Sequence, residues 1–114
     1  MNAIIPKDPA AEEKIDYSRP VPCYKYAREN SLPEQLAHIL GELNEVWEAV
    51  TDYTVYTDIP ELERKGRIAE ELTDVITSCR TALTILGYPE VEVECIQVNV
   101  NLKNRNRGYW EVKK

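Results

Sequence analysis

Two pairs of acidic residues, each inside an apolar run with helical spacing, most constrain the fold of this chain. Glu42 and Glu45 lie in the first run, and Glu71 and Asp74 lie in the second. A separation of three residues places both carboxylates of a pair on one side of a helix, about one turn apart. The sequence therefore predicts two helices that each present two carboxylates on one side.

A turn signal lies midway between the two pairs. Residues 57–60 contain an aspartate and a proline, and residue 58 is the midpoint both of 42 with 74 and of 45 with 71. An antiparallel hairpin folded here would place Glu45 level with Glu71 and Glu42 level with Asp74. Four carboxylates would then be close enough to surround a divalent cation.

Each predicted helix also has an apolar stripe. At about 100° per residue, the carboxylates of both helices lie roughly 80° to 150° to one side of the stripe, in the same rotational sense. In an antiparallel pair, equal displacements bring both sets of carboxylates into one groove beside the core. The stripes consist of Leu36, Ile39, Leu40, Leu43, Val46, Trp47 and Val50 on the first helix and of Ile68, Leu72, Val75, Cys79, Leu83 and Leu86 on the second.

Local start and stop signals set the helix boundaries. Ser31, followed by a proline and Glu34, predicts a helix start, so the first helix is expected over about 33–54. The second helix is expected from about 60 to Gly87, a residue suited to the left-handed position after a helix. Residues 89–106 fit both a strand period and a helical face. We favour a helix, because no partner strand is evident and a lone strand is not stable.

The predicted fold class is all-α, with a helical hairpin and a third helix. Residues 1–30 are rich in proline and are expected to form an extended or partly disordered arm. Residues 31–110 would form the helical domain and 111–114 a short tail. Two long helices and a third cannot easily enclose their apolar faces alone, so at least a homodimer is expected.

Composition excludes several classes of function. The net charge of −6 argues against general nucleic-acid binding. No apolar run approaches the roughly 18 residues of a membrane span, and the first residues lack the apolar segment of a signal peptide. Three cysteines without a metal-like spacing indicate reduced thiols and a cytoplasmic location. Cys79 and Trp47 lie on the apolar stripes and are expected in the core.

The acidic pairs suggest a metal site. Oxygen ligands without histidine or cysteine favour a hard cation, Mg²⁺, with Mn²⁺ as a substitute. Mg²⁺ often bridges phosphate oxygens, and Lys103, Asn104 and Arg107 at the end of the third helix would supply donors to a phosphorylated substrate. The alternative is a solvated acidic face and a basic cluster that complements a helix dipole. The residue pattern alone leaves both interpretations open.

The order of these motifs resembles one superfamily. Glu-x-x-Glu, a helix–loop–helix, Glu-x-x-Asp and a Lys-Asn-x-x-Arg ending are similar to the MazG-like all-α nucleotide pyrophosphohydrolases, which include the dimeric dUTPases and the phosphoribosyl-ATP pyrophosphatases. The resemblance covers residues 33–109 and implies a four-helix-bundle core that is completed in a homodimer or homotetramer. It departs from the family where Gly41 precedes Glu42, because the family often opens this motif with two glutamates.

The resemblance implies roles for individual residues. The carboxylates of Glu42, Glu45, Glu71 and Asp74 would bind metal and take part in catalysis. The phosphate ligands would be Lys103, Asn104 and Arg107.

The implied reaction is Mg²⁺-dependent hydrolysis of a nucleoside triphosphate between the α and β phosphates, giving the monophosphate and pyrophosphate. His38, one turn before Glu42, would contact base or phosphate, or would simply be a surface histidine. Two alternatives remain open: a pyrophosphatase for another phosphorylated metabolite such as phosphoribosyl-ATP, and a non-catalytic helical dimer that binds nucleotide or protein.

Overall fold

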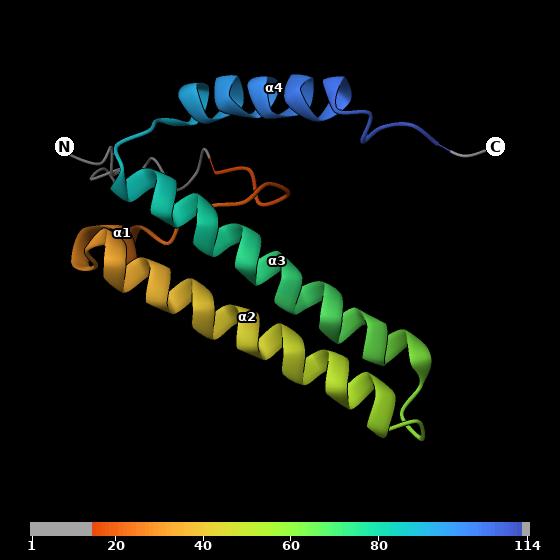
Figure 1. Cartoon of the computed structure of the whole chain (residues 1–114). Helices are drawn as coiled ribbons and strands as arrows, with labels where there is room; N and C mark the ends of the chain where they lie inside the picture. The colour runs from red at the N-terminus through yellow and green to blue at the C-terminus, as the bar shows by residue number, and fades with distance from the viewer. Residues whose placement is uncertain (1–14, 113–114) are drawn as a thin grey trace.

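The computed structural model describes residues 15–112, and this part of the chain is all-helical, as predicted, with no strand. The parts of the predicted arm and tail at 1–14 and 113–114 lie outside the described residues. Two long antiparallel helices form a hairpin, and the last helix lies on the other side of α3 from α2 (Figure 1). The helices are α1 (Tyr24–Glu29), α2 (Leu32–Val55), α3 (Glu61–Ile85) and α4 (Glu90–Asn106).

A capping box begins α2 at the predicted position. The backbone N–H of Glu34 donates to Ser31 Oγ over 3.3 Å, and the backbone N–H of Ser31 donates to Glu34 Oε1 over 3.0 Å. A proline stands in the first turn, where its missing N–H leaves no hydrogen bond unmade. These contacts satisfy donors that a helix start otherwise leaves exposed.

The hairpin turn lies where the sequence predicts it. The N–H of Ile59 donates to Tyr56 O over 3.2 Å, which closes the turn between α2 and α3. The Arg64 guanidinium donates to Tyr53 O over 2.6 Å and to Ile59 O over 2.8 Å. One arginine side chain therefore ties the end of α2 to the turn and to the start of α3.

A glycine ends α3, also as predicted. Gly87 has a φ of 89°, and its N–H donates to Thr84 O over 2.9 Å. The next N–H, that of Tyr88, donates to Leu83 O over 3.1 Å. Such bonds satisfy the last carbonyls of a helix, and the left-handed backbone favours glycine. The segment after this turn is helical, which confirms the helix over the strand.

The sequence pattern did not predict α1. Residues 23–26 allowed an extended piece, whereas Tyr24–Glu29 is a helix. An isolated helix this short is not stable in water. It is held by tertiary contacts, because the Cys23 N–H donates to Thr81 Oγ1 over 2.9 Å and Ala27 is buried against α3. A local pattern contains no information about such contacts.

The two long helices pack through small and polar side chains. Gln35 is fully buried, and its Nε2 donates to Ser78 O on α3 over 3.1 Å, while its Oε1 accepts from Asn30 over 3.0 Å. We call the line of contact between α2 and α3 the seam. The buried residues among 15–112 are Pro22, Ala27, Gln35, Ala49, Ser78, Thr81, Ala82 and Thr84.

The predicted core positions of Trp47 and Cys79 are wrong for the single chain. Trp47 is 69% exposed, and Cys79 is also exposed. Small residues such as Ala49 and Ser78 let the two helices approach closely, which turns the larger apolar side chains outward. At 100° per residue, the stripes lie roughly 120° to 130° around each helix from the seam.

These outward side chains form one surface, which we call the apolar face. The stripes of α2 and α3 are displaced from the seam in the same rotational sense, so both lie on the same side of the antiparallel pair. Large exposed apolar patches mark interaction sites on soluble proteins. The face consists of Leu36, Leu40, Leu43, Trp47, Val50, Leu72 and Ile76, which are 36–69% exposed.

Within residues 15–112, none of the helices combines the length and the apolar character that a membrane span requires. The cysteines Cys23, Cys79 and Cys95 all carry free thiols.

Candidate functional site

Three of the four predicted carboxylates meet in the seam. Glu42 and Glu45 come from α2 and Glu71 comes from α3, and each offers an oxygen atom that lies within 4.8 Å of the other two. We call these three residues the carboxylate cluster. Asp74 lies one turn along α3 from Glu71 and is not part of this close set. Its negative charge still acts on both Glu42 and Glu71.

Burial and neighbouring negative charge raise the pKa of two of these carboxylates, Glu42 and Glu71. The Glu42 side chain is only 17% exposed, and its burial, followed by the charge of Glu45, raises its pKa. Desolvation and then the contact with Glu45 raise the pKa of Glu71. Like charges at close range disfavour one another's ionised forms, and a cation between them would reverse the effect.

The cluster fits a hard divalent cation. Glu71 Oε2 is buried and has no hydrogen-bond partner among the described residues, so one acceptor in the seam is unsatisfied. Mg²⁺ binds oxygen at about 2.1 Å, which places ligands on opposite sides of the ion about 4.2 Å apart. The three carboxylate oxygens already lie within 4.8 Å of one another, so small side-chain rotations would bring them to this spacing.

His38 lies at one end of the cluster. Its Nε2 is 3.0 Å from Glu42 Oε1, and its ring faces Tyr26 of α1 with 5.1 Å between the ring centroids. The histidine thus holds one oxygen of Glu42 in place, and α1 borders the cluster on this side. Tyr26 therefore packs against α2.

The predicted basic residues lie elsewhere. Along α3, the residues that approach α4 are centred on Ile76, Cys79 and Leu83, and they share a pocket with the first half of α4. At 100° per residue this surface lies roughly 120° around α3 from Glu71. Figure 1 shows α4 diverging from the hairpin toward its C-terminal end. The body of α3 therefore separates the carboxylate cluster from α4.

The three predicted phosphate ligands all belong to the last turn of α4 or its cap. Lys103 and Asn104 lie in the helix, and Arg107 is its C-cap, with its N–H donating to Lys103 O over 3.0 Å. The structure thus assembles the carboxylates within one chain and does not bring these basic residues to them.

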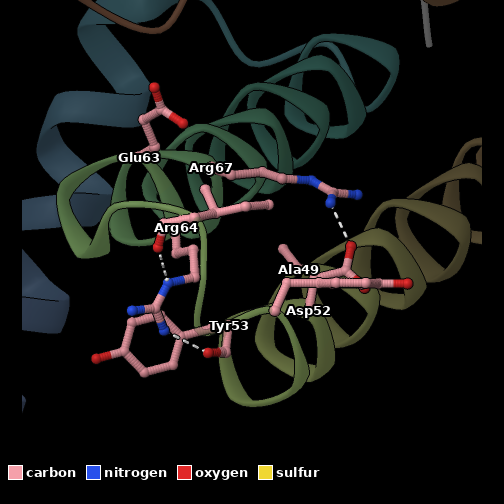
Figure 2. Close-up of a pocket in the computed structure, with 8 residues that line it drawn as sticks. Ala49, Asp52, Tyr53, Glu63, Arg64 and Arg67 are labelled. Atoms are coloured by element: carbon pink, nitrogen blue, oxygen red, sulfur yellow. Dashed lines mark hydrogen bonds and ion pairs between the residues drawn. The ribbon is translucent and has the colours of Figure 1, made fainter.

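The sequence pattern missed another arginine on the carboxylate side. Arg67 of α3 reaches across the seam to pair with Asp52 of α2 (Figure 2). Arg67 precedes Glu71 by four residues, so the two side chains share one side of α3. That spacing is visible in the sequence and could have identified the residue.

Comparisons with known proteins give no identification. No model of a known protein family matches the chain, and no significant match was found among curated proteins or among solved structures.

Proposed function

We propose that this protein is a Mg²⁺-dependent nucleoside triphosphate pyrophosphohydrolase that releases pyrophosphate by cleavage between the α and β phosphates. The observation that carries the proposal is the carboxylate cluster with its unsatisfied Glu71 oxygen. The resemblance of the motifs to the MazG-like enzymes supports the same reaction.

The proposal gives the carboxylate cluster the role of binding the metal and His38 the role of orienting one of its carboxylates. Glu42, Glu45 and Glu71 would hold the ion in the seam, and Asp74 lies one turn along α3 from Glu71. When bound, Mg²⁺ supplies neutralisation of phosphate charge and a more acidic water. His38 fixes the orientation of Glu42 through the 3.0 Å contact, which keeps one carboxylate pre-positioned before metal arrives.

The proposal includes an assembly of at least two chains. The apolar face is uncovered in one chain, and a second copy would bury it in a bundle. Because α3 stands between the carboxylates and α4, Lys103, Asn104 and Arg107 would serve the cluster of a neighbouring chain. A homodimer or homotetramer therefore accounts both for the exposed side chains and for the separated basic residues.

A panel of ribo-, deoxyribo- and modified nucleoside triphosphates tests the reaction. With Mg²⁺ present, the wild-type protein is expected to release pyrophosphate and monophosphate from at least one of them. Release of orthophosphate would assign a different cleavage. Phosphoribosyl-ATP belongs in the panel as a competing substrate. Nucleotide binding without any release would instead favour a non-catalytic binder, and the proposed activity would then be wrong.

A further inference from the structure

We propose that Arg67 binds the terminal phosphates of the metal-bound substrate, in a pocket that adjoins the carboxylate cluster, and that Asp52 holds its guanidinium in place until they arrive. This inference rests on the proposed function, because the cluster must bind a metal–phosphate group. It assigns the chain a cationic phosphate ligand of its own.

The pocket continues the seam beyond the cluster. It has a volume of about 330 Å³ and is lined from α2 by Ala49, Asp52 and Tyr53 and from α3 by Glu63, Arg64 and Arg67. Ala49 follows Glu45 by one turn, and Arg67 precedes Glu71 by one turn, about 6 Å along the helix axis. A phosphate chain bound at the cluster would therefore extend directly into this pocket.

The two arginines in the pocket differ in the contacts that their guanidinium groups make. The Arg64 guanidinium lies 4.7 Å from the centroid of the Tyr53 ring and donates to two backbone carbonyl groups, so it is committed to the turn. Among residues 15–112, the Arg67 guanidinium pairs with Asp52 alone, and its side chain is 50% exposed. Figure 2 shows it directed across the pocket toward Asp52.

The Arg67–Asp52 ion pair is exposed and contributes little to the stability of the fold, so replacing Asp52 by a phosphate as the partner of Arg67 costs little free energy. A phosphate group offers the guanidinium the same bidentate geometry as a carboxylate and carries more charge. The cluster also needs a nearby cation, because three carboxylates repel a triphosphate beyond what one divalent ion neutralises. Within a single chain, Arg67 meets this need from the same side of α3 as Glu71.

The test measures binding of inorganic pyrophosphate in the presence of Mg²⁺ by calorimetry, together with kcat/KM on the best triphosphate. Arg67→Gln is expected to weaken both by about 10- to 150-fold, the range for a charged hydrogen bond to phosphate. Lys65→Gln is the matched control, since Lys65 also pairs with an acidic residue, Glu61, on α3 but points away from the seam. Arg67→Lys should retain part of the affinity.

A double variant separates direct contact from simple charge balance. In Asp52→Asn/Arg67→Gln the net charge equals that of the wild type, so full recovery would mean that Arg67 only neutralises Asp52 and would overturn the proposal. Persistent weak binding supports it. Asp52→Asn alone frees Arg67 and should bind pyrophosphate at least as tightly as the wild type.

The outcomes distinguish this inference from the proposed function. If the wild type releases pyrophosphate and Arg67→Gln keeps its kcat/KM and pyrophosphate affinity within about twofold, Arg67 is not a phosphate ligand while the enzyme assignment stands. If the wild type neither binds pyrophosphate with Mg²⁺ nor releases it from triphosphates, both fail. Thermal unfolding of each variant checks that it is folded, and the double variant covers the case in which an unpaired Asp52 destabilises Arg67→Gln.

Discussion

Glu42 and Glu71 bind protons more tightly in the folded chain than ordinary glutamates do, and burial beside another carboxylate is the reason. In the metal-free protein, negative charge on Glu42 and Glu71 is therefore energetically unfavourable. Gln35 and Ser78, each about two turns away, are neutral polar residues that are buried in the same seam, where Gln35 Nε2 donates to Ser78 O. A cation bound between these carboxylates would relieve this unfavourable electrostatic energy.

This arrangement predicts the sign of a pH dependence. Because the folded pKa values are raised, the folded state binds more protons than the unfolded state. Its free energy of unfolding then falls as pH rises from the ordinary glutamate value of 4.5 through the raised pKa values. We expect metal-free wild type to lose this contribution as the pH rises above 4.5 in urea unfolding with chelator present.

The matched comparison is Glu42→Gln/Glu71→Gln, which removes both groups. Glu34 and Glu61 have lowered pKa values, so their contribution to stability increases as pH rises. Both proteins contain these residues, so the free energies of unfolding of wild type and variant are compared at each pH. With chelator present, the free energy of unfolding of the variant should exceed that of the wild type by an amount that grows as pH rises. If the two free energies of unfolding differed by the same amount at every pH, ionisation of Glu42 and Glu71 would not destabilise the fold.

At the scale of elements, the helix boundaries follow from local chemistry. Ser31 and Gly87 each act through their own backbone neighbours, so the sequence was sufficient to place the start of α2 and the end of α3. The level arrangement of Glu45 and Glu71 could also be predicted, because it depends only on the turn position and helix geometry. The all-α class followed from the same reasoning.

The surfaces by which the elements meet could not be predicted in this way. A stripe of large apolar residues was expected to form the contact between the long helices, yet Ala49 and Ser78 form it and Trp47 faces outward. Periodicity identifies a face that must be covered but does not say by which chain. Likewise α1 depends on Thr81, far along the chain, and Arg67 pairs with a residue on the other helix.

The capping box gives a prediction for α2. Ser31→Ala removes the hydroxyl that accepts from the Glu34 N–H and should lower the free energy of unfolding by about 0.5–2 kcal/mol. Thr57→Ala, an exposed turn position, serves as the control and should change it by less than about 0.5 kcal/mol. Both are measured at one protein concentration, because assembly makes stability concentration-dependent. Equal unfolding curves for Ser31→Ala and wild type would show that the box is dispensable.

At the scale of the whole molecule, the uncovered apolar face predicts self-association. Its α2 residues recur with alternating spacings of four and three, the pattern of helices that pack on one another. Light scattering at micromolar concentration should show a dimer or tetramer for wild type and a smaller species for Leu40→Glu/Trp47→Glu. Val112→Glu, at an exposed position outside the face, should assemble normally. A monomeric wild type with cooperative unfolding would contradict this prediction.

Mixing inactive variants tests where the basic residues act. Glu45→Gln lacks a carboxylate of the cluster, and Arg107→Ala lacks a proposed phosphate ligand. If the ligand serves a neighbouring chain, unfolding the two together and refolding them should restore roughly a quarter of wild-type pyrophosphate release, since half of the chains assemble as mixed dimers with one intact site each. No recovery, with mixed dimers demonstrated by differential tagging, would place the basic residues in their own chain's site or outside the site.

The central claim is that the carboxylate cluster binds a divalent cation, and Mn²⁺ titration followed by electron paramagnetic resonance tests it most directly. Wild type should bind Mn²⁺, and Mg²⁺ should displace it. Loss of a group that only supports a metal ligand costs about 10- to 100-fold in affinity, so Glu45→Gln, which removes a ligand itself, should cost roughly 100-fold or more. Glu92→Gln, on exposed α4, should bind as the wild type does. Equal Mn²⁺ affinity in wild type and Glu45→Gln would contradict the account.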